Sequence, residues 1–161
     1  VSGPYTAGPK EHAMKRSVSA IWSGDLRSGH GALATHSSVR KETPYTLVTR
    51  FESAAGTNPE ELIAAAHAGC FTMALAASLG RAGFSPRRLA TQASVSLEQI
   101  SGNWTITGVH LENEAWIAGI SDERFQQIAA DAKANCQESR LLRAEISLNA
   151  RLEGGEGGEA H

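Results

Sequence analysis

The chain has 161 residues, of which 41% are hydrophobic and 20% are charged, and its formal net charge at pH 7 is −2. This composition is that of a soluble globular domain, whose length allows about 70% of the unfolded chain's surface to be buried. No basic run is long enough for nucleic acid or anionic membrane, and no apolar run approaches the roughly 20 residues that a membrane span needs.

Both ends of the chain are predicted to lie outside the folded part. Residues 1–13 show no periodic pattern, so we expect an N-terminal extension there. Residues 153–161 are rich in Gly and Glu, a composition that forms a flexible tail and buries no core. The sequence therefore predicts a single folded domain over residues 14–152.

The first part of this domain is predicted to be a small antiparallel meander. Apolar and polar residues alternate over 18–22, and a second strand is predicted over 32–35. Residues 46–51 are rich in β-branched and apolar side chains, which predicts a third strand. Arg50 would then lie at the end of that strand.

A long helix is predicted from Leu62 to about Leu79. Its start is marked by Asn58, which can cap, by Pro59, which suits the first helical position, and by Glu60 in the first turn. The helix is apolar nearly all round, a pattern typical of a helix that is buried on every side. Because one small domain has trouble covering such a helix, we expect a homodimer in which it packs against the partner.

The second half of the domain returns to strands. Two strands are predicted over 93–97 and 104–111, and a second helix begins at Ser121, with an apolar stripe that ends at Cys136. The clearest alternation in the chain covers residues 144–152 and predicts a final strand. The predicted order is three strands, a long helix, two strands, a helix and a final strand. This order indicates an α+β fold with a mainly antiparallel sheet.

Cys70 and Cys136 lie on the apolar faces of the two predicted helices. A buried free cysteine is most often a small hydrophobic residue, and this interpretation stays open for both. If the helices pack together, the thiols could meet, as a peroxidatic thiol and a resolving thiol must. No signal peptide is visible, so we expect the protein to be cytoplasmic. In that compartment two cysteines indicate redox or ligand chemistry more than a structural disulfide.

A buried thiol ionises at neutral pH only when a cation stands close to it. Cys70 lies in the middle of its predicted helix, so the positive end of the helix dipole gives its thiol little help. The candidate cation is Arg50, at the end of the predicted strand, and Glu60 is the candidate carboxylate that holds it. Glu60 and Cys70 are ten residues apart, about 15 Å along a straight helix, and cannot touch within it. Either the helix is broken or another subunit supplies the glutamate. The alternative is that both are ordinary solvated charges.

A metal site is the competing hypothesis. His67 lies three residues before Cys70, so the two could share a metal on one helical face. Zinc takes three or four ligands, and only Cys136, His110 and remote histidines are left to supply them. We therefore expect no metal, and we interpret His67 as a packed histidine with a hydrogen-bond partner.

Two segments carry a resemblance to a known family. Residues 49–52, Thr-Arg-Phe-Glu, and residues 56–71, Gly-Thr-Asn-Pro-Glu-Glu-Leu-Ile-Ala-Ala-Ala-His-Ala-Gly-Cys-Phe, closely resemble the signature of the osmotically inducible protein C (OsmC) family. The resemblance runs from about Met14 to Leu152. The position of the arginine favours OsmC over the sister organic hydroperoxide resistance (Ohr) proteins.

The resemblance implies an α+β fold, with mainly antiparallel sheets wrapped around long central helices in an intertwined homodimer. It implies that Cys70 is the peroxidatic cysteine and Cys136 the resolving cysteine, that Arg50 stabilises the thiolate, and that Glu60 holds Arg50. The implied function is reduction of organic hydroperoxides to alcohols in oxidative and osmotic stress defence. The implied partners are an external dithiol reductant and a second copy of the chain, with no metal, prosthetic group, nucleic acid or membrane.

The sequence departs from the family pattern directly after Cys136. The family often has proline there, followed by small or apolar residues, whereas this chain has Gln137 and Glu138. We expect the Glu138 charge to raise the thiol pKa and slow resolution. The alternative function is a dimeric module that binds a hydrophobic ligand and leaves both thiols idle.

Overall fold

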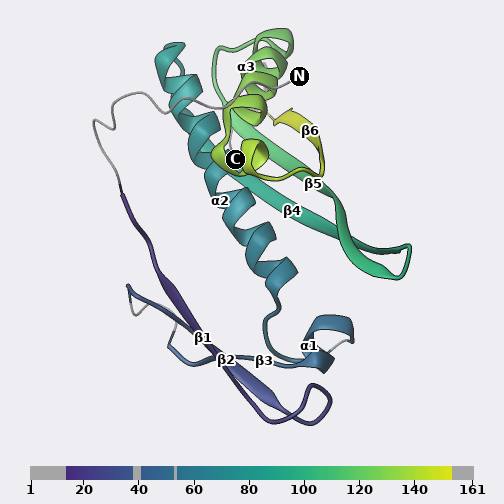
Figure 1. Cartoon of the computed structure of the whole chain (residues 1–161). Coiled ribbons are helices and arrows are strands. Elements are labelled where there is room, and N and C mark those ends of the chain that lie inside the picture. The colour runs from purple at the N-terminus through teal and green to yellow at the C-terminus, as the bar shows by residue number, and fades with distance from the viewer. Residues whose placement is uncertain (1–13, 38–40, 53, 154–161) are drawn as a thin grey trace, which may run out of the picture. The chain divides into compact units, whose positions relative to one another are not determined.

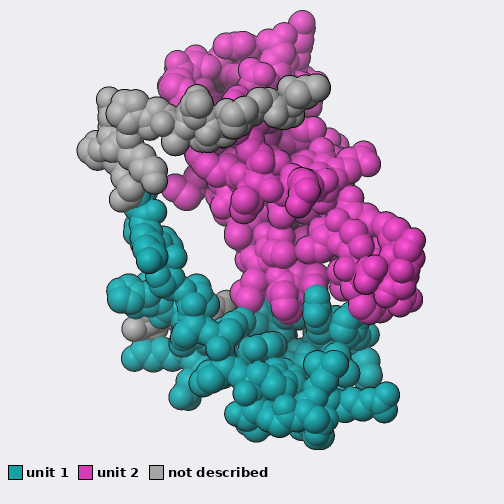
Figure 2. Space-filling model, in the orientation of Figure 1, with its two compact units in different colours: residues 1–58 teal, residues 59–161 magenta. Residues whose placement is uncertain are grey.

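The computed structural model describes residues 14–37, 41–52 and 54–153 (Figure 1). The expected extension over 1–13 lies outside the described residues, as does the expected tail apart from Glu153. The chain divides into two compact units, residues 1–58 and residues 59–161, which Figure 2 distinguishes by colour. Each unit is described by itself.

The first unit contains an antiparallel meander, as predicted, but its third strand lies earlier in the chain than expected. Strands β1 (Val18–Ser23), β2 (His30–Thr35) and β3 (Thr43–Tyr45) form one sheet in the order β1-β2-β3. The rings of Trp22 and Tyr45 pack against each other with their centroids 5.5 Å apart. Gly31 pairs with both residues, and a Cβ atom there would overlap the Tyr45 ring. A glycine is therefore required at this close approach.

The prediction of a strand over residues 46–51 is wrong. The chain forms a short helix there, α1 (Leu47–Phe51), and the third strand ends before it. Thr46 is the N-cap, and its side chain accepts a hydrogen bond from the Thr49 amide at 3.1 Å, while the Thr49 hydroxyl accepts one from the Thr46 amide at 2.9 Å. This capping box satisfies two amides locally, which outweighs the β-propensity of the segment. Arg50 consequently lies in the last turn of a helix.

The second unit is the larger one. Its elements in chain order are α2 (Pro59–Arg81), β4 (Pro86–Ile100), β5 (Asn103–Ile117), α3 (Asp122–Asn135), α4 (Gln137–Leu141) and β6 (Glu145–Glu153). The strands β4 and β5 form a long antiparallel hairpin, and β6 pairs with β5 in parallel, so the order is β4-β5-β6. The crossover that a parallel pair needs runs through α3 and α4. The predicted α+β class is confirmed, and the sheets are mainly antiparallel.

The core of this unit lies between the sheet and the helices. Helix α2 packs on β4, α3 packs on β6, and the two helices contact each other (Figure 1). Helix α2 buries one face at steps of four residues, which carries His67, Phe71, Leu75 and Leu79. The sheet and α3 supply further residues of the apolar core, including Val109, Leu111, Phe125, Ile128 and Ala132. This face fixes the rotation of α2 and so places every other side chain on it.

The remaining surface of α2 is apolar but exposed in the described chain. Met73 is 75% exposed, and 22% of the apolar stretch of the helix is buried. The expectation of burial on every side is therefore not met within one chain. The expectation that no apolar run reaches membrane-spanning length was also wrong, because alanines extend the run through most of α2. By length and composition alone this one helix could cross a membrane, which is weak evidence because core helices pass the same test.

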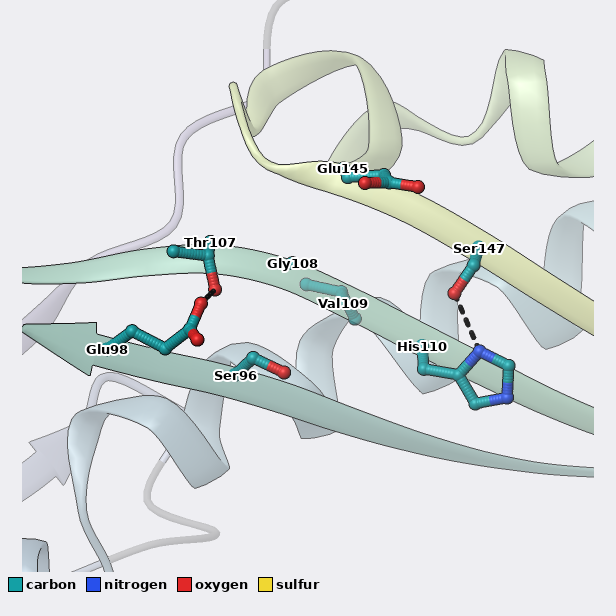
Figure 3. Close-up of a pocket in the computed structure, with 8 residues that line it drawn as sticks. All are labelled: Ser96, Glu98, Thr107, Gly108, Val109, His110, Glu145 and Ser147. Atoms are coloured by element: carbon teal, nitrogen blue, oxygen red, sulfur yellow. Dashed lines mark hydrogen bonds between the residues drawn. The ribbon is translucent and has the colours of Figure 1, made fainter. Parts of the chain in front are cut away.

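His67 links α2 to α4. Its side chain is fully buried, and Nε2 lies 2.8 Å from the Ser139 hydroxyl. The prediction of a packed histidine with a hydrogen-bond partner is confirmed. A comparable pair lies on the exposed face of the sheet, where His110 Nδ1 is 2.6 Å from the Ser147 hydroxyl beside a polar hollow (Figure 3).

We expect Ser139→Ala to lower the free energy of unfolding by about 1–3 kcal/mol, because it leaves a buried imidazole nitrogen without its partner. The matched control is Ser147→Ala, which removes a similar contact from an exposed pair and should cost less than about 0.5 kcal/mol. Urea unfolding of both variants measures the two costs. Equal losses in the free energy of unfolding would show that the buried His67–Ser139 hydrogen bond stabilises the fold no more than the exposed His110–Ser147 contact.

Candidate active site

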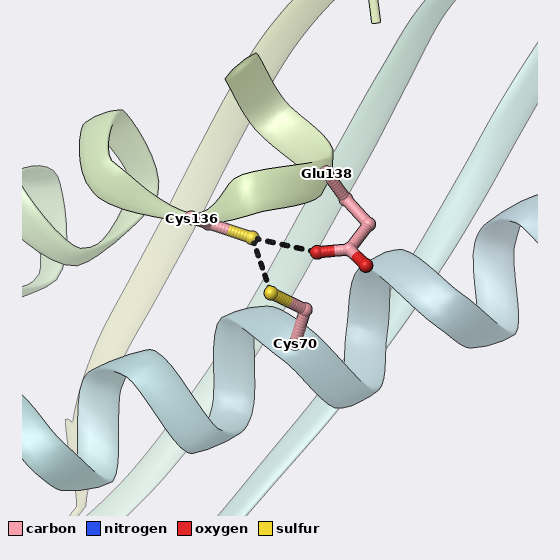
Figure 4. Close-up of side chains that lie close together, drawn as sticks. All are labelled: Cys70, Cys136 and Glu138. Carbon is pink, nitrogen blue, oxygen red and sulfur yellow. Dashed lines mark hydrogen bonds between the residues drawn. The ribbon is translucent and has the colours of Figure 1, made fainter. Parts of the chain in front are cut away.

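The structure brings the two cysteines together. Cys70 is half-buried in the middle of α2, and Cys136 is fully buried between α3 and α4. Their sulfur atoms lie 3.2 Å apart and both are free thiols (Figure 4). The predicted meeting of thiols that are 66 residues apart is therefore confirmed.

The backbone at Cys136 explains how its thiol reaches α2. Cys136 ends α3 and caps α4 in an extended conformation, with φ −61° and ψ 132°. Its amide still donates to the Ala132 carbonyl at 2.9 Å, so the residue stays attached to the last turn of α3. The break directs the following short helix over α2. The sequence predicted the end of α3 near this residue but not α4.

Two polar side chains from the start of α4 contact the thiols. The Cys70 thiol donates to Oε1 of Gln137 at 3.0 Å, and the Cys136 thiol donates to Oε2 of Glu138 at 3.8 Å. The position of the Glu138 charge near the thiols agrees with the prediction from the sequence, whereas the contact of Gln137 with Cys70 was not predicted. Its only signal was a polar residue directly after Cys136, where the family often has proline.

The described surroundings of Cys70 oppose its ionisation. Burial raises the pKa of the Cys70 thiol to about 12, and the hydrogen bonds with Glu138 and Cys136 act in the same direction. The backbone amides of Gln137 and Glu138 lower the pKa but do not compensate. A thiol with this pKa is protonated at neutral pH, so nucleophilic chemistry at Cys70 requires a cation that counters burial and the carboxylate.

We expect Glu138→Gln to lower the pKa of Cys70, because a neutral amide no longer repels the thiolate. The midpoint of the pH dependence of Cys70 alkylation by iodoacetamide should fall by about one pH unit. Mass spectrometry of the modified peptide reads Cys70 separately from Cys136. The matched control is Glu112→Gln, at an exposed position of β5. An unchanged midpoint in Glu138→Gln would mean that the carboxylate does not act on Cys70.

Arg50 and Glu60 occupy different parts of the chain. Arg50 is exposed in α1 of the first unit, where its guanidinium stacks on the Phe51 ring at 5.2 Å from the centroid. Glu60 lies in the first turn of α2, in the second unit. Helix α2 is continuous from Pro59 to Arg81, so the alternative of a broken helix is wrong. Glu60 cannot reach the Cys70 of its own helix, and the roles of Arg50 and Glu60 remain predictions.

Within the described part of the chain, His67 and His110 each pair with a serine and do not join the cysteines as metal ligands. His67 Nε2 bonds Ser139, and His110 lies with Ser147 on the exposed face of the sheet. Among the described residues, one group of three candidate ligands lies close together, namely Cys70, Cys136 and Glu138, whose ligand atoms are all within 4.8 Å of one another.

The residues around this site match a known family. The sequence model described as OsmC-like protein matches residues 52–151. The chain belongs to the OsmC-like family. This OsmC-like chain is 47% identical over 133 residues to peroxiredoxin OsmC of Escherichia coli, and the matched region covers 83% of this chain and 93% of that relative. It is 30% identical over 98 residues to the organic hydroperoxide resistance protein of Xanthomonas axonopodis pv. citri, covering 60% of the chain and 67% of that protein. The predicted family is confirmed.

Solved structures agree with the fold of the OsmC-like chain. An OsmC-like protein of unknown function from Vibrio cholerae matches with a TM-score of 0.70 at 14% identity, covering 86% of this chain and 100% of that one. The organic hydroperoxide resistance protein OhrB of Bacillus subtilis matches with a TM-score of 0.61 at 20% identity, covering 85% and 98%. At these identities the likeness concerns the fold alone, and it confirms the predicted OsmC/Ohr architecture.

Proposed function

We propose that this OsmC-like chain is a cysteine-dependent peroxidase that reduces organic hydroperoxides to alcohols in defence against hydroperoxide stress. The observation that carries the proposal is the 3.2 Å separation of the Cys70 and Cys136 sulfur atoms, because a peroxidatic thiol needs a resolving thiol within reach. Relatives named peroxiredoxin OsmC and organic hydroperoxide resistance protein support it.

The proposed reaction has two steps. The Cys70 thiolate attacks the distal peroxide oxygen, the O–O bond breaks, and the departing alkoxide takes a proton to become the alcohol. Cys70 is then a sulfenic acid. The Cys136 sulfur attacks the Cys70 sulfur, a disulfide forms, and the hydroxyl leaves as water with the proton of the Cys136 thiol. An external dithiol reduces the disulfide by thiol exchange.

The proposed cation for the first step is Arg50. Burial and Glu138 hold Cys70 protonated in the described surroundings, so a guanidinium must approach the sulfur for a thiolate to form. A guanidinium can also stabilise the charge that develops on the leaving alkoxide, and a carboxylate can orient it by a bidentate pair. We propose Glu60 for that role. Because α2 is continuous, a Glu60 that serves a given Cys70 comes from a second copy of the chain.

We propose that the chain works as a homodimer. The exposed apolar surface of α2, which includes Leu62 and Met73, supports this because a second copy could cover it. Light scattering after size exclusion is expected to give twice the mass of the chain, and a monomer at micromolar concentration would contradict the dimer. The proposed compartment is the cytoplasm, where reducing thiols keep both cysteines available for turnover.

The experiment that tests the peroxidase is mass spectrometry of the reduced protein after one equivalent of cumene hydroperoxide. We expect a loss of two hydrogen atoms and a peptide in which Cys70 is joined to Cys136. The same treatment of Cys136→Ser should leave an oxidised Cys70 that a sulfenic acid reagent traps. Two unmodified thiols after exposure to the peroxide would overturn the proposal.

The alternative function is a dimeric module that binds a hydrophobic ligand and leaves its thiols idle. The raised pKa of Cys70 in the described surroundings favours this alternative, because an idle buried thiol has that property. The pH dependence of Cys70 alkylation in the wild-type protein separates the two functions. A midpoint at or above the ordinary cysteine pKa of about 8.5 supports the binding module, whereas a midpoint below it supports the peroxidase.

A further inference from the structure

The group formed by Cys70, Cys136 and Glu138 has the composition of a metal site. Two thiols and one carboxylate come from the middle of α2 and from the start of α4, and their ligand atoms all lie within 4.8 Å of one another. Figure 4 shows the two sulfur atoms and the Glu138 carboxylate pointing toward a common space. Sulfur donors with a carboxylate are the ligands of zinc rather than of magnesium or calcium, which take oxygen ligands alone.

The spacing of these atoms is close to that of a tetrahedral zinc site. With Zn–S bonds of about 2.3 Å and a Zn–O bond of about 2.0 Å, two sulfur ligands lie about 3.8 Å apart and a sulfur and an oxygen about 3.5 Å apart. The observed distances are 3.2 Å between the sulfur atoms and 3.8 Å between Cys136 Sγ and Glu138 Oε2. Metal binding therefore requires the two sulfur atoms to move apart and the Glu138 carboxylate to approach Cys136, by rotation of these side chains.

The fourth coordination position would stay open. Cys70 is half-buried and Gln137 is exposed, so water reaches the edge of the site. The Gln137 amide oxygen lies 3.0 Å from Cys70 Sγ, so it is close enough to the site to accept a hydrogen bond from such a water. Three protein ligands and one open position are the arrangement in which zinc remains exchangeable and accessible to small molecules.

We propose that Cys70, Cys136 and Glu138 bind one Zn²⁺ per chain while both thiols are reduced. Binding replaces the two thiol protons, which pass to solvent, and gives three anionic ligands around the cation. Glu138 is then a metal ligand that this chain carries where its family often has a small or apolar residue. The site exists only in the reduced protein, because a Cys70–Cys136 disulfide removes two of its three ligands.

The consequence for the enzyme rests on the proposed peroxidase function. Bound zinc occupies the Cys70 sulfur, so it competes with the peroxide for the nucleophile. When a hydroperoxide does oxidise the pair, two thiolates, two protons and the peroxide give the disulfide, the alcohol and water, and the Zn²⁺ ion is released unchanged. Zinc would thus hold the enzyme in a protected reduced state, and oxidation would release the ion.

The test is a titration of the full reduced chain with Zn²⁺ without oxygen, in competition with a chromophoric chelator. We expect one ion per chain, and a Co²⁺-loaded sample should show the thiolate-to-cobalt absorption that two sulfur ligands produce. Loss of even a hydrogen-bond partner of a ligand weakens metal binding about 10- to 100-fold, so Glu138→Gln should raise the Kd at least about tenfold. Glu112→Gln makes the same charge change at an exposed position of β5 and should leave the Kd unchanged.

The outcomes separate this inference from the peroxidase proposal. No stoichiometric Zn²⁺ binding, or an equal Kd for Glu138→Gln and the wild type, overturns the zinc site whatever the peroxidase assay shows. Peroxidase activity is measured separately in the presence of excess chelator. If zinc binds and leaves after one equivalent of cumene hydroperoxide, the site is established. If zinc binds but the chelated protein has no peroxidase activity, the site stands and the proposed function fails.

Discussion

Cys70→Ser is expected to lower kcat/KM for cumene hydroperoxide by about a thousandfold or more, to the background rate. The reason is that a serine hydroxyl cannot replace a thiolate as nucleophile toward a peroxide oxygen, and removal of a nucleophile typically costs several orders of magnitude. A steady-state assay with a small dithiol as reductant measures the loss. Full activity in this variant would remove Cys70 from the mechanism and with it the proposed peroxidase.

Cys136→Ser provides the matched control for this prediction, because it removes the other sulfur of the same pair. Its first turnover should proceed at the wild-type rate and leave a sulfenic acid at Cys70, since Cys136 acts only after the O–O bond has broken. An exogenous thiol should then restore part of the steady-state activity. A variant that fails already in the first turnover would show that Cys136 contributes to the attack on the peroxide.

Arg50→Lys is expected to lower kcat/KM by about a hundredfold, although the side chain keeps its positive charge. A lysine offers a point charge on a flexible stem, whereas the guanidinium fork can bond a carboxylate and the peroxide at the same time. The loss of one donor that stabilises developing charge typically costs about 10²- to 10³-fold. The pKa of Cys70, read from the pH dependence of its alkylation, should rise in the same variant.

The control for Arg50→Lys is Arg87→Lys, at an exposed position of β4. It makes the same chemical change and should alter neither kcat/KM nor the Cys70 pH profile. If Arg50→Lys behaves like this control in both measurements, the cation that ionises Cys70 is another group. The prediction tests an assignment that follows from the family motif, since Arg50 and Cys70 belong to different compact units.

The site combines two opposing electrostatic demands. A peroxidatic thiol must ionise, yet Glu138 places a carboxylate beside both sulfur atoms. Without a cation, the Glu138 carboxylate disfavours ionisation of the thiols. When a cation is bound, the carboxylate joins the two thiolates as a third anionic group around it. The two proposals supply that cation in different ways, a guanidinium during turnover and a zinc ion at rest. Glu138→Gln therefore changes both, with a lower pKa of Cys70 and a weaker zinc site.

Periodicity was sufficient for most of the fold and failed where a local cap decided the structure. The long helix α2 and the strand β6 follow from patterns that extend over many residues, and both were predicted within a few residues of their ends. The segment 46–51 has the composition of a strand, yet the reciprocal bonds between Thr46 and Thr49 turn it into a helix. The average strand propensity of residues 46–51 does not take these two side-chain hydrogen bonds into account.

The sequence by itself determined the family, the α+β class and the two cysteines, because these depend on residue identities and on patterns along the chain. Only the tertiary structure decided that the sulfur atoms lie 3.2 Å apart and that Gln137 and Glu138 contact them. The physical reason is that this geometry depends on how the buried face of α2 packs against α3 and on the break at Cys136. Contacts between residues far apart in the sequence set that packing, and no local pattern encodes them.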